Sequence, residues 1–128
     1  MAAKIERITL AGEREPVSHF CHVTKAGPIV WVSGLVGQAP DGSIPESTVA
    51  QFDNAMNTMA KCLKAAGAGP EHVVKVLVFM TDIKERPLIN PRRIAFFGEH
   101  KPASTLVEVT SLVDPRMKVE IEAMAYVG

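Results

Sequence analysis

The chain has 128 residues, and its fourteen Lys and Arg residues balance fourteen Asp and Glu residues, so the formal net charge is zero. This length fits one domain and leaves too few residues for a second hydrophobic core. A neutral chain has no overall field that would attract nucleic acid or an anionic membrane surface, so neither is expected as a partner. We therefore predict a single domain over residues 1–128.

The N-terminal residues and the apolar runs bear on location. No apolar run approaches the roughly 20 residues that a membrane-spanning helix needs. Lys4, Glu6 and Arg7 lie where a signal peptide would have its apolar segment. We expect a cytoplasmic protein.

Residue types that bind metals are sparse. Cys21 and Cys62 are the only cysteines, too few for a disulfide framework or a cysteine zinc site. The four histidines include no pair at the spacing of helical metal ligands, and no acidic cluster accompanies them. We expect reduced cysteines, no metal and no other cofactor.

The balance of apolar and charged residues favours self-association. Apolar residues make up 47% of the chain, whereas only 22% of the residues are charged. A domain of this size removes only about two-thirds of its chain surface from water, so the apolar surface left over often marks an interface. An oligomer is therefore expected.

The first half of the chain is predicted to form strands followed by one long helix. Turn residues over 25–28 separate two β-rich runs, which is typical of a β-hairpin. Apolar residues alternate at spacings of three and four from Val49 to Ala66, which predicts an amphipathic helix with Ser47 as its N-cap. The predicted elements are a strand over 7–10, a loop over 11–18, strands over 19–24 and 29–33, a Gly- and Pro-rich loop over 34–45, and a helix over 47–66.

The second half is predicted to contain a strand, a helix and two further strands. Residues 73–81 are apolar on both alternating sets apart from Lys75, which is typical of a central strand covered on both faces. A helix is expected over 87–99, with Asn90 close to its start and Pro91 in its first turn, where an amide hydrogen is not required. Strands over 104–110 and 117–127 end the chain, with Asp114 and Pro115 in the turn between them.

These elements describe an α+β sandwich with two helices on one face of the sheet. The last strand alternates, so Glu120 and Glu122 are expected on the opposite face, beside Met124 and Tyr126. Because two helices cover only one face, solvent or another subunit must meet the other. We expect a subunit contact there, with pockets at its edge.

Motifs in the second half resemble a known family. Residues 101–109, Lys-Pro-Ala-Ser-Thr-Leu-Val-Glu-Val, followed by 119–123, Val-Glu-Ile-Glu-Ala, resemble the C-terminal signature of the RidA/YjgF family of imine and enamine deaminases. Further matching positions are Val32-Ser33-Gly34, the helix with Gln51, residues 74–82, and Asn90 with Ala95-Phe96-Phe97. The resemblance implies a chorismate-mutase-like fold with a mixed six-stranded sheet, and a homotrimer with clefts between neighbouring subunits.

The chain resembles a divergent member of that family. In the family, an arginine directly after the Pro-Ala pair binds the substrate carboxylate, and the first glutamate of the final strand orients the attacking water. Glu120 keeps the glutamate, but Ser104 stands where the arginine would be. Leu106 replaces a common cysteine, and Phe20 replaces an aromatic hydroxyl near the pocket entrance. Losing one partner of a desolvated charge pair costs about 2 to 5 kcal/mol, so plain 2-aminoacrylate is disfavoured as substrate.

Glu120 is the candidate catalytic residue, and a solvated strand glutamate is the alternative interpretation. Seven further residues are candidates for substrate binding: Phe20, Ser33, Gly34, Asn90, Arg93, Ser104 and Leu106. Plainer interpretations stay open, with Asn90 as a helix cap and Ser33 as a turn serine. Arg92 and Arg93 are the nearest candidates for a relocated cation. His19 and His22 lie beside Phe20, where one of them could carry a proton into the pocket.

Two hypotheses about function follow. The first is a homotrimeric, cofactor-free hydrolase that deaminates a small enamine or imine, with Glu120 positioning water in an intersubunit cleft. By analogy with aminomuconate deaminases of the family, a longer unsaturated amino acid is one concrete alternative to 2-aminoacrylate as its substrate. The second is a non-catalytic trimer that binds small metabolites or partner proteins in the same clefts. Ribonuclease activity ranks third, because a neutral chain with scattered Phe residues offers no stacking platform for bases.

Overall fold

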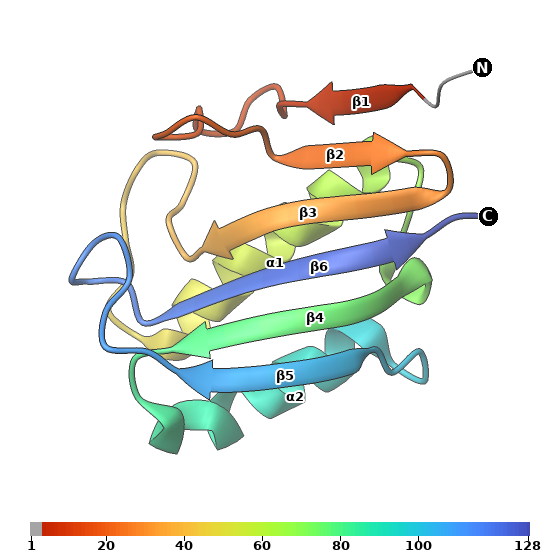
Figure 1. Ribbon diagram of the computed structural model, residues 1–128. Coiled ribbons are helices and arrows are strands. Elements are labelled where there is room, and N and C mark those ends of the chain that lie inside the picture. Colours follow the sequence, from red (N-terminus) through yellow and green to blue (C-terminus); the bar gives the residue numbers. More distant parts are fainter. Residues whose placement is uncertain (1–3) are drawn as a thin grey trace.

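The computed structural model describes residues 4–128 and contains one mixed sheet backed by two helices. The sheet has six strands in the order β1-β2-β3-β6-β4-β5, and only β4 and β5 pair in parallel. Both α-helices lie behind the same face of the sheet (Figure 1). The elements are β1 (Ile5–Ile8), β2 (Val23–Ala26), β3 (Ile29–Val36), α1 (Thr48–Ala65), the 3-10 turn η1 (Pro70–His72), β4 (Val73–Met80), the 3-10 turn η2 (Ile83–Glu85), α2 (Arg86–Phe97), β5 (Ala103–Glu108) and β6 (Val119–Tyr126). The predicted α+β architecture is thereby confirmed.

The core lies between the sheet and α1, as the periodicity predicts. In β6, Val119, Ile121, Ala123 and Ala125 are buried, whereas Glu120, Glu122 and Met124 are only partly buried on the opposite face. The apolar stripe of α1 supplies the fully buried Phe52, Met59 and Leu63. Ser47 is the N-cap of α1, and its Oγ accepts a hydrogen bond of 2.9 Å from the amide of Ala50. The alternating strand therefore leaves one face of the sheet without helical cover.

The prediction of a strand over 19–24 is wrong for residues 19–22, because β2 begins only at Val23. Residues 21 and 22, just before it, are held by side-chain hydrogen bonds and by one backbone bond rather than by a regular ladder. The Oγ of Ser33 donates a hydrogen bond of 2.6 Å to the carbonyl of Cys21, and the amide of Leu10 donates one of 2.9 Å to Nδ1 of His22. The first strand also comes two residues earlier than predicted, since Ile5–Ile8 pairs with β2.

The start of α2 differs from the prediction as well. The helix begins at Arg86 with Pro87 in its first turn, so Pro91 lies in the helix interior. The 3-10 turn η2 leads directly into the helix, and Asp82 caps that turn by accepting a hydrogen bond from the amide of Lys84. Asn90 is consequently inside the helix, and the interpretation of Asn90 as a helix cap is wrong.

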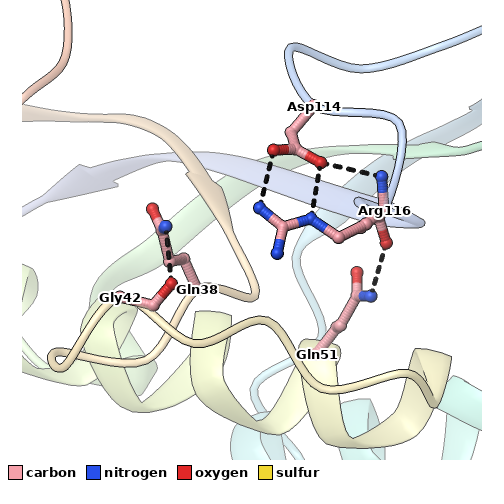
Figure 2. Close-up of polar contacts among 5 residues, drawn as sticks. All are labelled: Gln38, Gly42, Gln51, Asp114 and Arg116. Atoms are coloured by element: carbon pink, nitrogen blue, oxygen red, sulfur yellow. Dashed lines mark hydrogen bonds and ion pairs between the residues drawn. The ribbon is translucent and has the colours of Figure 1, made fainter.

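A buried amide on α1 connects the helix to the segment that precedes β6. The side chain of Gln51 is fully buried, and its Nε2 donates hydrogen bonds to the carbonyls of Pro45 and Arg116 at 2.8 and 2.9 Å. Its Oε1 accepts a hydrogen bond of 2.8 Å from the amide of Lys118. Figure 2 shows the hydrogen bond from Gln51 to the Arg116 carbonyl beside the bidentate ion pair of Arg116 with Asp114. Gln51 thus holds the chain two residues before Glu120.

None of the helices within residues 4–128 combines the length and the apolar character needed to cross a lipid bilayer.

Candidate functional site

A cavity of about 480 Å³ lies where the end of β3 and the start of β6 meet the N-terminal segment. Residues 13–18 and Phe20 form one wall, and Val113, Asp114 and Met117 of the segment before β6 form another. Gly34 and Glu120 also line it. The cavity therefore contains the one residue that the sequence singled out for catalysis.

The carboxyl group of Glu120 lies directly against the backbone of Gly34. A β-carbon built on Gly34 would be 2.0 Å from Oε2 of Glu120, so only glycine leaves room for the carboxyl there. The pairing of β3 with β6 is irregular between Val32 and Leu35, and Gly34 sits in this irregularity. The sequence motif Ser33-Gly34 and the glutamate of the last strand are thus brought into contact.

The surroundings of Glu120 favour its protonated form. Partial burial of the side chain raises the pKa of the Glu120 carboxyl, and the nearby Glu122 carboxylate raises it further. A carboxylate whose pKa is raised is a stronger base than an ordinary one, so it accepts a proton from water more readily. This is the protonation behaviour that a group exchanging protons with water requires.

The wall of the cavity combines exposed apolar side chains with one buried imidazole. Phe20 is 49% exposed, and Val17 and Val113 are 71% and 76% exposed. His22 lines the same cavity but is only 7% exposed. His19 does not line it. Of the two histidines considered as proton carriers, only His22 reaches this cavity.

Two candidate binding residues have other roles within one protomer. The Oγ of Ser33 donates its hydrogen to the carbonyl of Cys21, and the Ser33 amide donates to the carbonyl of His22 at 3.0 Å. Leu106 is partly buried and packs against the hydrophobic core. Neither side chain lines the cavity of Glu120.

A second hollow, of about 430 Å³, lies between α2 and the segment that leads into β5. Asn90, Arg93 and Lys101 line it together with Ile94, Phe97, Gly98 and Pro102. Nη2 of Arg93 donates a hydrogen bond of 2.7 Å to Oγ of Ser104. Desolvation lowers the pKa of Arg93, and the like charge of Arg86 adds to this effect. Three of the candidate binding residues therefore meet in this second place.

The two arginines on α2 have different partners. Arg92 forms an ion pair with Asp53, with 3.4 Å between Nε and Oδ1. Arg93 pairs with no carboxylate among residues 4–128, and its recorded side-chain partner is the neutral hydroxyl of Ser104. Of the two arginines, Arg93 is thus the one left available to an anion.

One protomer keeps these two sets of residues apart. Ser104 pairs with Val76, whose side chain is buried under the helices, so Ser104 points towards the helical face. Glu120 lies on the opposite face, since its neighbours Val119 and Ile121 fill the core. The structure therefore brings together Phe20, Gly34 and Glu120 in one cavity, and Asn90, Arg93 and Ser104 around the other hollow.

Sequence reasoning missed the loops that enclose the first cavity. Thr58 and Gln38 line it from α1 and from the segment after β3, and Glu13 lines it from the N-terminal segment. Glu13 is held in place by Lys61 of α1, with 2.5 Å between Oε1 and Nζ. Contacts this far apart in the sequence leave no periodic signal.

No three His, Cys, Asp or Glu side chains within residues 4–128 lie close enough together to hold a metal ion.

Comparisons with known proteins agree with the motifs. The model of the endoribonuclease L-PSP family matches residues 12–127. A RutC family protein of Pyrococcus abyssi is 31% identical over 118 residues, which cover 88% of this chain and 89% of that protein. The 2-iminobutanoate/2-iminopropanoate deaminase of Escherichia coli K12 is 31% identical over 123 residues, or 91% of this chain and 95% of the relative.

A solved structure has the same fold. The crystal structure of the YjgF gene product from Escherichia coli superimposes with a TM-score of 0.87 at 28% identity, covering 94% of this chain and 98% of that one. Because the family model spans nearly the whole chain, the chain belongs to the endoribonuclease L-PSP family, which is the RidA/YjgF family that its C-terminal motifs resemble.

Proposed function

We propose that the protein hydrolyses the C=N bond of a small imine or enamine metabolite, with Glu120 as the group that takes a proton from the attacking water. The observation that carries this proposal is the position of the Glu120 carboxyl, which lies against Gly34 in a cavity and has a raised pKa. The Escherichia coli relative named as an imine deaminase supports the same reaction type.

The reaction needs one proton-exchanging group and no electron transfer. The Glu120 carboxylate accepts a proton from water while the water oxygen bonds to the imine carbon, and the nitrogen takes up that proton. In the resulting carbinolamine, Glu120 accepts the hydroxyl proton and returns it to the nitrogen. The C–N bond then breaks, so that the products are a carbonyl compound and ammonia.

A cation is needed where the substrate carries a carboxylate, and we assign this role to Arg93. Its guanidinium touches the hydroxyl of Ser104, the residue at which the family has its arginine. Arg93 is half-buried and pairs with no carboxylate among the described residues. A desolvated guanidinium without a counterion favours binding of an anion, and the amide of Asn90 in the same hollow adds a hydrogen-bond donor. Leu106 serves as an apolar spacer beside Ser104.

The two halves of this site belong to different protomers in our proposal. Glu120, Gly34, Phe20 and the backbone at Ser33 come from one subunit, and Arg93 with its neighbours comes from the next. A homotrimer with clefts between subunits would join them. The uncovered sheet face favours such an assembly, because Trp31 and Tyr126 are 40% and 49% exposed on strands that pair in the centre of the sheet.

Arg93 reaches its position from a helix, whereas the family's arginine is on the strand. The carboxylate site is therefore displaced relative to the family's, and a substrate with a differently placed carboxylate fits better than 2-aminoacrylate. An aminomuconate-like unsaturated amino acid is the concrete candidate. The alternative is a trimer without catalytic activity that uses the same clefts to bind small metabolites or partner proteins.

Ammonia release from freshly generated substrates tests the proposal. The purified protein is assayed with 2-aminoacrylate, 2-iminobutanoate and aminomuconate, and its mass is measured under native conditions. We expect a trimer, turnover above the spontaneous rate, and a loss of about 10²-fold or more in Glu120→Gln. Glu122→Gln, two residues further along the same face of β6, is the control for the loss of one negative charge from this face. A folded trimer that hydrolyses none of the three substrates would support the non-catalytic alternative and refute the enzyme.

A further inference from the structure

His22 is a buried titratable residue in the wall of the Glu120 cavity that the proposed reaction does not use. It immediately precedes β2, and only 7% of its surface is exposed. Its backbone carbonyl is engaged by the amide of Ser33. The imidazole is therefore held at a defined place beside the proposed reaction centre.

One ring nitrogen of His22 has its protonation state set by the backbone. The amide of Leu10 donates a hydrogen bond of 2.9 Å to Nδ1. A nitrogen that accepts a hydrogen bond carries no proton, so the hydrogen of the neutral imidazole is on Nε2. The hydrogen bond from the Leu10 amide thus selects the tautomer in which Nε2 is the donor.

The other ring nitrogen is available to a ligand. Nε2 of His22 donates to no acceptor among residues 4–128. Every fully buried side-chain nitrogen and oxygen in this range has a hydrogen-bond partner, so Nε2 is not one of the fully buried atoms. Nε2 must therefore be in contact with solvent. Because the ring is otherwise buried and lines the cavity, the cavity is where that contact occurs.

We propose that His22 binds the substrate by donating a hydrogen bond from Nε2 to a carbonyl or carboxylate oxygen. The proposal rests on the proposed deaminase function and names a binding group for it. The cavity then presents the Glu120 carboxylate as an acceptor and the His22 Nε2–H as a donor, in a wall that carries the apolar Val17, Phe20 and Val113 and also charged side chains, among them Arg14, Glu15 and Asp114. A 2-imino acid matches this pair, because its N–H can donate to Glu120 while its carboxylate accepts from His22, and the 2-oxo acid formed from it keeps the acceptor oxygens for His22. His22 donates a hydrogen bond only and transfers no proton, since a neutral imidazole that lost Nε2–H would become an anion.

Nuclear magnetic resonance of the ring nitrogens tests this assignment without relying on turnover. The native chain is labelled with ¹⁵N-histidine and titrated with 2-oxobutanoate, the stable product of 2-iminobutanoate hydrolysis. We expect the spectrum of His22 to show hydrogen on Nε2 before addition and a change of the Nε2 signal on addition. A His22 ring with hydrogen on Nδ1, or one that does not respond to millimolar 2-oxobutanoate, would overturn the proposal.

Two substitutions separate a binding role from a structural one. In His22→Gln the amide oxygen can still accept from Leu10, and the amide hydrogens can still donate into the cavity. In His22→Leu both contacts are lost. We expect the Kd of 2-oxobutanoate to rise about tenfold in His22→Leu and to stay within about threefold in His22→Gln. Equal affinity in wild type and His22→Leu would refute a binding role, and if His22→Leu does not fold, the titration of the native chain decides.

The outcomes for the two proposals are distinguishable. A His22 ring that responds to 2-oxobutanoate in a protein that hydrolyses no imine would refute the deaminase and leave the binding group intact. Turnover with a silent His22 ring would do the reverse. Glu120→Gln, which loses the base, should abolish turnover while the His22 ring still responds to 2-oxobutanoate.

Discussion

Substitution of Gly34 by Ala should reduce catalysis far more than stability. A β-carbon at this position would be 2.0 Å from Oε2 and 2.9 Å from Cδ of Glu120. Because real β-carbon contacts essentially never fall below 3.0 Å, the carboxyl must move by at least about 1 Å. A misplacement of this size costs about 10²-fold in rate where one group must meet the reacting atom. We expect kcat for imine hydrolysis to fall by about that factor in Gly34→Ala.

The free energy of unfolding should change little in the same variant. The clashing atoms are the far end of a flexible glutamate side chain, and the backbone of Gly34 is not in the left-handed region. Replacing glycine by alanine in a compatible conformation restricts the unfolded chain and is stabilising by about 0.4 to 1 kcal/mol, which offsets part of any strain. We therefore expect a net change of less than about 1 kcal/mol.

Gly27→Ala is the matched control with the opposite pattern. Gly27 lies in the turn between β2 and β3 with a φ of 56°, and a β-carbon there would meet nothing within 4 Å. Alanine in the left-handed region costs about 1 kcal/mol of stability, so Tm should fall while kcat stays unchanged. Both variants are assayed for ammonia release and for thermal unfolding. Wild-type kcat in Gly34→Ala would refute the assignment of the Glu120 carboxyl as the reacting group.

Three further predictions concern the second hollow, the proton of the site and the buried amide. Arg93→Ala should raise KM for a carboxylate substrate about 30-fold or more, whereas the control Arg92→Ala should change KM by no more than about twofold. Equal KM values in the two variants would refute the assignment of Arg93 as the carboxylate-binding residue. Burial raises the pKa of Glu120 in the folded protein, and the Glu122 carboxylate raises it further. The contribution of the Glu120 carboxyl to stability is therefore fully present below its pKa in the unfolded chain, and it is lost as pH rises through its pKa in the folded protein. Glu120→Gln should accordingly have a higher Tm than wild type at pH 7, with the difference shrinking towards about pH 4, and a Tm difference independent of pH contradicts the raised pKa. Gln51→Leu breaks three buried hydrogen bonds and should lower the free energy of unfolding by about 2 to 4 kcal/mol, measured in urea. The control Gln38→Ala breaks one hydrogen bond, to Gly42, and should cost less than about 1 kcal/mol. Similar losses in both variants would argue against the role of Gln51.

Local periodicity predicted the long elements well because it records which side of an element is apolar. The stripe from Val49 to Ala66 indicated α1 and its Ser47 cap, and the alternation of β6 indicated which side Glu120 occupies. Where side chains from distant segments replaced regular pairing, the prediction failed. The late start of β2 depends on contacts of Cys21 and His22 with Ser33 and Leu10, and no local pattern contains them.

The candidate site was predictable residue by residue but not as an arrangement. Motif resemblance named Glu120, Gly34 and Phe20, and these three meet in one cavity. It also named Ser104, and Arg93 was a candidate because it lies one helical turn from Asn90, but the direct hydrogen bond between the two depends on α2 lying across β5.

The amino-acid sequence by itself determined the α+β class, the face of the sheet on which Glu120 stands, and the absence of the arginine after Pro102-Ala103. Only the tertiary structure decided that the Glu120 carboxyl contacts Gly34 and that Arg93 donates a hydrogen bond to the hydroxyl of Ser104. The same holds for His22, whose Nε2 faces the cavity. The physical reason is the sequence separation of the interacting residues. Helix and strand patterns arise from neighbours a few residues apart, whereas each of these contacts joins segments whose meeting depends on how the whole core packs.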